Sequence, residues 1–144
     1  MTAETKRNLQ TNTPAGVSLL TKALRADGAF ALFSGLILLL GANPLADLFE
    51  LFQATALILL GVVLLSYAAM LFFFAGRNLE QAGARLAIIL NLTWVIVSYA
   101  GLLSGWFPVN SAGKWAIALV AEAVMIFAIV EFIALRRATK EVVG

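Results

Sequence analysis

The sequence predicts an all-α membrane protein that folds as a four-transmembrane-helix antiparallel bundle. Of the 144 residues, 62% are apolar and only 12% are charged, whereas soluble domains average roughly 45–50% apolar residues. The mean hydropathy is +0.95. A chain of this length buries only roughly two-thirds of its surface when it folds in water, so a soluble fold would leave much apolar surface exposed. In addition, four stretches reach the length of about 20 residues that a helix needs to cross a bilayer.

The four spans are expected at about 19–41, 51–76, 86–105 and 114–136. The uncharged part of the first stretch is short, so its helix has to begin near Leu19 to cross the membrane. The second and third stretches contain no Asp, Glu, Lys or Arg, and the fourth is interrupted only by Glu122 and Glu131. Residues 1–18 are expected to form a polar N-terminal tail and residues 137–144 a C-terminal tail, both on the cytoplasmic side of the bundle.

Basic residues predict the orientation of the bundle. Nine of the 10 Lys and Arg residues lie on the side that holds both termini, and Lys114 alone lies on the other side, with Asp47 and Glu50. Because basic flanks stay in the cytoplasm, both termini are expected there. Trp106 and Trp115 lie at the opposite boundary, as in an aromatic belt. No basic stripe interleaved with aromatic residues lies outside the membrane ends, so no nucleic-acid partner is expected.

A shift of 64 residues aligns the first span with the third. The polar, glycine and proline matches are Asp27 on Asn91, Ser34 on Ser98, Gly41 on Gly105 and Pro44 on Pro108. They predict two repeats, each a two-helix hairpin, with the same orientation in the membrane. Chance similarity between two apolar helices is the alternative.

Small residues predict where the helices approach one another. In lipid, helices associate through close contact at small residues and through hydrogen bonds between helices. Residues seven apart lie on nearly the same face of a helix, and glycine or alanine recurs at this spacing along the second span. The glycines expected to pack helices together are Gly41, Gly61, Gly101 and Gly105.

Polar side chains from all four spans are expected at one depth. A rise of about 1.5 Å per residue places Asp27, Asn91 and Glu131 at similar distances from the outer boundary, together with Ser66 and Tyr67 of the second span. The favoured interpretation is structural, with hydrogen bonds that hold the helices together. A site for a proton or a solute is the alternative.

Glu122 has a different environment from Glu131. The two residues are nine apart, which at about 100° per residue places them on opposite faces of one helix. A carboxyl group at this depth is expected either to become neutral or to find a partner. That partner is expected either on another chain or ligand, or within the bundle at Tyr99, which lies at a similar depth.

The absence of two residue types excludes several kinds of chemistry. The sequence contains no His and no Cys, which excludes disulfides, Cys/His zinc sites, Cys nucleophiles and haem held by His or thiolate. It contains no phosphate-binding glycine loop, and Glu122 and Glu131 diverge too far to act as a catalytic pair. We therefore expect no enzyme activity, no cofactor and no metal site.

These observations favour a non-catalytic accessory or scaffold subunit. Such a subunit would dock through its helix faces in a larger membrane complex, for instance a bioenergetic one. The expected partners are membrane lipids and either other membrane protein subunits or further copies of the same chain. The alternative is a small transporter, or a lipid- or quinone-binding protein, that uses the intramembrane carboxylates.

Several short motifs carry a resemblance to a known group of proteins. They are Leu24-Arg25-Ala26-Asp27-Gly28, Ser34-Gly35-Leu36, Arg77, Asn91-x-x-Trp94-Val95 and Arg136-Arg137. With these motifs the sequence resembles a family of uncharacterised bacterial integral membrane proteins with four transmembrane helices. The resemblance implies a location in the bacterial inner membrane and carries over no functional residue.

Overall fold

The fold is an all-α bundle with four membrane-spanning helices, as the composition predicted. The computed structural model describes residues 15–51 and 53–143, and these residues form helices and turns without a strand. The helices are α2 (Ala15–Leu40), α3 (Ala42–Leu48), α4 (Thr55–Ala75), α5 (Glu80–Ser104) and α6 (Ser111–Val143). Four of them, α2, α4, α5 and α6, are long and apolar enough to cross a membrane. The predicted fold class is therefore confirmed.

Most of each spanning helix faces outwards. In the most apolar 18-residue window of each helix, only 22% to 33% of the residues are buried inside the protein. Large apolar side chains such as Phe33, Ile96 and Ile126 are at least 60% exposed. Surfaces of this kind are stable against lipid and unstable against water. The molecule is therefore built as a multi-pass membrane protein.

The first and last helices are longer than the sequence predicted. The helix α2 begins at Ala15, and α6 continues to Val143. Residues 15–18 and 137–143, which were expected to belong to tails, are helical. The rest of the expected N-terminal tail, residues 1–14, lies outside the described residues.

Contacts between the ends of α2 and α6 explain these extra turns. Leu20 and Ala138 are both 0% exposed and belong to one apolar cluster. The backbone N–H of Gly16 donates a hydrogen bond of 2.9 Å to Glu141 Oε2. Since the first N–H groups of a helix have no partner within it, this carboxylate from α6 caps α2. The two ends therefore stabilise each other as helices.

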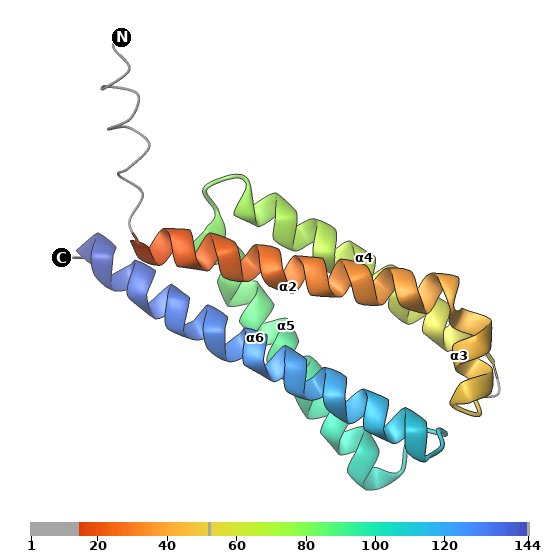
Figure 1. The fold of residues 1–144 in the computed structure, drawn as a ribbon. Helices are drawn as coiled ribbons and strands as arrows, with labels where there is room; N and C mark the ends of the chain where they lie inside the picture. The colour runs from red at the N-terminus through yellow and green to blue at the C-terminus, as the bar shows by residue number, and fades with distance from the viewer. Residues whose placement is uncertain (1–14, 52, 144) are drawn as a thin grey trace.

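The first span ends in a turn and the short helix α3. The helix α2 stops at Leu40, and α3 follows after Gly41 at the end of the bundle remote from the termini (Figure 1). Pro44 lies in the first turn of α3, where its missing N–H has no intrahelical partner to lose. Ala42 and Ala46 of α3 are buried against Leu57 of α4. The helix α3 therefore closes that end of the α2–α4 hairpin.

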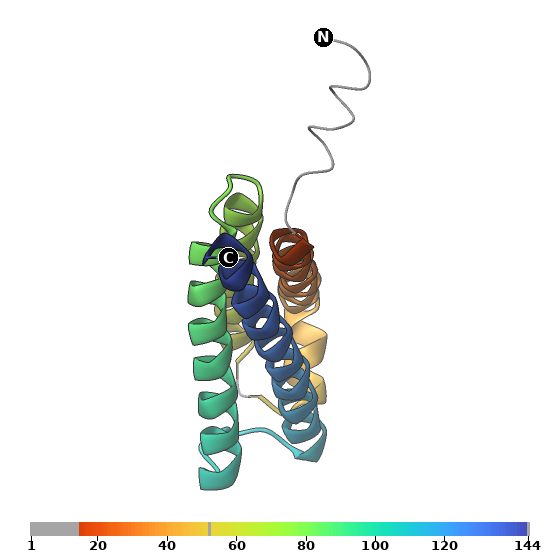
Figure 2. The same ribbon diagram turned by 90° about the vertical axis from the view of Figure 1, so that its left-hand side faces the viewer.

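The four long helices form two antiparallel hairpins, α2 with α4 and α5 with α6, and α2 packs against α6 between them. The described ends of the chain lie at the same end of the bundle (Figures 1 and 2). The 64-residue shift that predicts a repeat also aligns buried positions of α2 with buried positions of α5. The buried positions of α2 that fall on buried positions of α5 are Leu20 on Ala84, Ala23 on Ala87, Asp27 on Asn91 and Ala31 on Val95. This pattern supports two hairpins related by a repeat.

One close approach between spanning helices involves Gly61, one of the four glycines that the sequence predicts to pack helices together. A Cβ atom placed on Gly61 would lie 3.0 Å from the carbonyl oxygen of Gly35, and one placed on Gly35 would lie 3.0 Å from the Gly61 carbonyl oxygen. The two backbones of α2 and α4 thus contact each other directly, as small residues allow in membranes. Gly35 was not among the glycines selected.

The other three selected glycines lie at helix ends instead of between spans. Gly41 precedes α3, and a Cβ atom there would lie 2.8 Å from the carbonyl oxygen of Ile37. Gly101 is covered by the ring of Phe107 from the loop after α5. Gly105 ends α5 with a φ of +70° and has no atom within 4 Å of an added Cβ. The four-residue spacing of Gly101 and Gly105 thus reflects the way α5 ends.

Replacing Gly105 with alanine is expected to lower the free energy of unfolding by about 1 kcal/mol, because its φ of +70° is unfavourable for a residue with a Cβ. The control is Gly76→Ala at the end of α4. Gly76 has a φ of −101°, so its substitution should change stability by less than about 0.5 kcal/mol. Unfolding in detergent micelles, followed by circular dichroism, measures both values. Equal values for the two variants would contradict this explanation.

Candidate functional site

Four polar side chains, one from each spanning helix, form a hydrogen-bonded network inside the bundle. Asp27 comes from α2, Tyr67 from α4, Asn91 from α5 and Glu131 from α6. The Tyr67 hydroxyl donates to Asp27 Oδ2 at 2.7 Å and lies 3.0 Å from Asn91 Oδ1. Asn91 Nδ2 donates to Asp27 Oδ2 at 2.9 Å and to Glu131 Oε2 at 3.4 Å. Three residues that the sequence placed at one depth are thus in contact.

Three of the four network residues are enclosed by the protein, and Tyr67 is half-buried. Asp27 is 1% exposed, Asn91 4% and Glu131 0%. One turn towards the basic end of the bundle, each of the four helices contributes a buried apolar side chain, and these are Leu24, Leu71, Ala87 and Ala134. One turn in the other direction, Ala31, Val95 and Ala128 are also buried. The polar layer is therefore held between two apolar layers.

The hydrogen bonds follow the internal repeat. Tyr67 and Asp27 are 40 residues apart, and so are Glu131 and Asn91. The two hairpins therefore make equivalent bonds at equivalent places. Asp27 and Asn91, which the repeat aligns at a separation of 64 residues, bond to each other directly. The network lies where the two hairpins meet.

Tyr67 joins the network, whereas its neighbour Ser66 does not. Ser66 is exposed, and its hydroxyl donates to the carbonyl oxygen of Val62 within α4. The sequence placed both residues at the right depth but did not single out Tyr67 as a site residue. Consecutive residues differ by about 100° around a helix, so depth alone does not separate them. The signal available in the sequence is that Tyr67 and Glu131 are related by the same shift as Asp27 and Asn91.

Two buried polar atoms near this layer have no hydrogen-bond partner. They are Oε1 of Glu131 and Nε1 of Trp94. Trp94 lies one turn from Asn91 on α5. Buried polar atoms without partners are rare in folded proteins. The unpartnered Glu131 oxygen is therefore a feature that a purely structural network does not explain.

Glu122 lies on the opposite side of α6 from Glu131. It is exposed, and its Oε1 accepts a short hydrogen bond from the hydroxyl of Tyr99 on α5. Of the two partners considered from the sequence, Tyr99 is thus in contact with it. The pair lies on the outer surface of the α5–α6 hairpin, within the spanning parts of both helices. It places a carboxyl group on a surface that is otherwise largely apolar.

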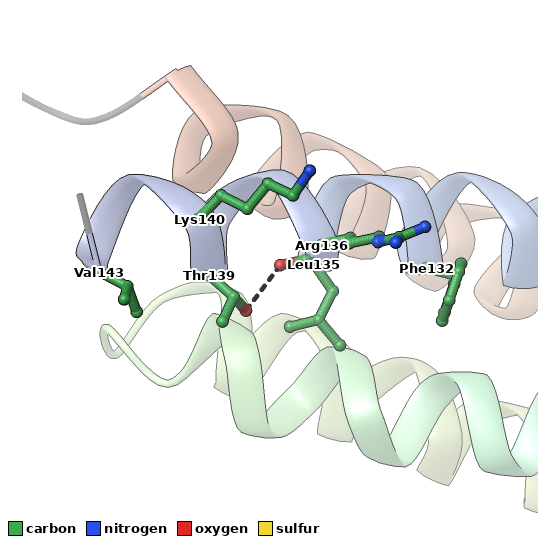
Figure 3. Close-up of a pocket in the computed structure, with 6 residues that line it drawn as sticks. All are labelled: Phe132, Leu135, Arg136, Thr139, Lys140 and Val143. Carbon is green, nitrogen blue, oxygen red and sulfur yellow. Dashed lines mark hydrogen bonds between the residues drawn. The ribbon is translucent and has the colours of Figure 1, made fainter.

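The surface hollows lie apart from these residues. One, with a volume of about 420 Å³, is located near the C-terminal end of α6, where Arg136 and Lys140 lie beside apolar side chains (Figure 3). A second hollow of about 350 Å³ lies around the turn from α4 to α5, next to Val17. None of the network residues lines either hollow.

Comparison with known proteins gives no relative. The sequence matches no family model, and no curated protein and no solved structure is significantly similar to it.

Proposed function

We propose that this protein is a non-catalytic membrane subunit that docks through an outer face of its helices in a larger membrane complex. The observation that carries the proposal is the placement of its polar groups. Asn91 donates hydrogen bonds to both Asp27 and Glu131, and all three residues are enclosed between apolar layers. A substrate or solute has no access to them in this arrangement, and their hydrogen bonds stabilise the bundle.

The surface around Glu122 is the proposed docking face. A carboxyl group on a lipid-facing surface is unfavourable, and Tyr99 supplies it with only one donor. A helix of another subunit that brings a further donor would remove the remaining carboxyl surface from lipid. Ala118 and Met125, one turn away on either side, are small or flexible enough to accommodate such a helix.

The distribution of charge supports a location for the protein. Among the described residues, every Lys and Arg except Lys114 lies towards the end of the bundle that holds both described chain ends. The positive-inside rule then assigns this end to the cytoplasm. We place the protein in the inner membrane of a bacterium, with both termini in the cytoplasm and Trp106 and Trp115 at the outer boundary.

Site-specific cross-linking tests the docking face. The chain has no Cys, so a single introduced Cys reports on one position. Ala118→Cys and Met125→Cys report on the docking face. Val62→Cys on α4 is the control on another exposed face. We expect both α5–α6 face variants to cross-link to the same partner at fixed stoichiometry in native membranes. Adding Glu122→Leu should reduce that product several-fold, whereas adding Thr93→Val, which changes an exposed residue bonded only within α5, should not.

Other results would contradict the docking function. The proposal is wrong if the Cys variants cross-link only to lipid. It is also wrong if Glu122→Leu leaves the cross-linked product and the co-isolated partner unchanged. A lone chain that supports ion-dependent solute uptake in liposomes would favour the transporter instead. The unpartnered Oε1 of Glu131 is the one observation that favours this second function.

A further inference from the structure

The polar network has more contacts than hydrogens to fill them. Four pairs of polar atoms lie within hydrogen-bond distance, two at the Tyr67 hydroxyl and two at Asn91 Nδ2. The hydroxyl of Tyr67 has one hydrogen and the amide of Asn91 has two. These three hydrogens cannot fill four contacts. The contact left without a hydrogen is one of the two made by Tyr67, to Asp27 Oδ2 or to Asn91 Oδ1.

One additional hydrogen on the carboxyl groups resolves this shortage. With a hydrogen on Asp27 Oδ2, Asp27 donates to the Tyr67 oxygen, and the Tyr67 hydroxyl is then free to donate to Asn91 Oδ1. The two amide hydrogens of Asn91 continue to donate to Asp27 and Glu131. Oε1 of Glu131, which is buried and has no partner, belongs to none of the four contacts, so a hydrogen there would not resolve the shortage.

The charges of the network lead to the same conclusion. Asp27 and Glu131 both accept from one nitrogen, Asn91 Nδ2, so the two carboxyl groups are neighbours in the interior. Their hydrogen-bond partners, Tyr67 and Asn91, are neutral. Two adjacent negative charges without a counterion are strongly unfavourable in a low-dielectric interior, and two carboxyl groups that share a site commonly share a proton.

We propose that Asp27 and Glu131 bind one proton between them, so that the network is a proton site with one negative charge. Binding forms a single O–H bond on the pair and takes the proton from bulk water, and no other bond changes. The proton belongs to the pair rather than to either residue. The proposal is independent of the docking function, because it concerns the interior and not the Glu122 face.

The side chains around the pair do not supply a positive charge. Tyr67 faces it from α4 and Asn91 faces it from α5, and both of these side chains are neutral. The nearest basic residues along α2 and α6, Arg25 and Arg136, are exposed. The pair is therefore stabilised by hydrogen bonds and by one shared proton, and not by an ion pair.

Infrared spectroscopy of the full chain in phosphatidylcholine liposomes tests the proposal. A protonated carboxylic acid has a C=O stretching band that is separate from the bands of a carboxylate and shifts in D₂O. We expect one protonated carboxyl group per chain at neutral pH, in addition to any contribution from Glu122. Glu131→Gln should remove this band, because it leaves one carboxyl group in the network and so removes the second negative charge that the shared proton offsets. Asp47→Asn, at an exposed position in α3, should leave the band unchanged.

The measurement on the unmodified chain is decisive even if a variant fails to fold. Absence of a protonated carboxyl group at neutral pH would overturn the proposal. So would a band that persists in both Glu131→Gln and Asp27→Asn, or one that is lost in Glu122→Gln and kept in Glu131→Gln. Loss of the band on addition of sodium at constant pH would also overturn it, because the site would then bind a metal cation in place of the proton.

Discussion

Replacing Asn91 with leucine is expected to lower the free energy of unfolding by about 2–4 kcal/mol. Asn91 contacts the network residues of all three other spanning helices. Leucine has a similar size, so the change removes the hydrogen bonds without leaving a large cavity. It also leaves Asp27 and Glu131 side by side without their shared donor, and a buried group deprived of its partner is more costly than the loss of an average bond.

Unfolding of the full chain in detergent micelles, followed by circular dichroism, measures this effect. Thr93→Val is the matched control on the same helix. Thr93 is exposed, and its hydroxyl donates only to the Ile89 carbonyl oxygen within α5, so its loss should change stability by less than about 0.5 kcal/mol. If Asn91→Leu were no more destabilising than Thr93→Val, the network would not hold the four helices together.

Replacing Gly61 with leucine is expected to destabilise the bundle by about 2–3 kcal/mol through overpacking. A Cβ atom there would lie 2.9 Å from Leu39 Cγ and 3.0 Å from the Gly35 carbonyl oxygen. The Leu39 side chain can move, but the Gly35 backbone can do so only if α2 and α4 separate. Lipid offers no compensating gain for such a separation, because helix contacts in membranes depend on close packing.

The control for Gly61→Leu is Ala69→Leu on the same helix. Ala69 is exposed, so a larger apolar side chain there should be accommodated by lipid with little effect on stability. Thermal unfolding in the same detergent compares the two variants. Similar melting temperatures for Gly61→Leu and the unmodified chain would show that the α2–α4 contact tolerates separation.

The spans and the depth of the polar layer were predictable because both depend on distance along a helix. Apolar length identified four crossings, and the rise per residue placed Asp27, Asn91 and Glu131 at one level. The ends of α2 and α6 were not predictable in this way. They remain helical because Gly16 and Glu141, 125 residues apart in the sequence, bond to each other, and such a contact leaves no local pattern.

The contributions of individual side chains to the site were harder to predict than its depth. Glycine spacing did not separate Gly61, which lies between two spans, from Gly105, whose positive φ ends a helix. The same spacing arises from both causes. For Glu122 the sequence predicted a hydrogen-bond partner either outside the bundle or at Tyr99. Tyr99 is identified as the partner only when the packing of α5 on α6 is known.

The direct bond between Asp27 and Asn91 requires the two halves of this protein to differ. Two identical copies of a single hairpin, assembled about a symmetry axis, would bring the same side chain to that axis from both sides. Two aspartates there would have to share a proton, and two asparagines would form a neutral amide pair. Joining the hairpins in one polypeptide allows an acid to meet an amide, so this unsymmetrical pair depends on the sequence difference between the two halves.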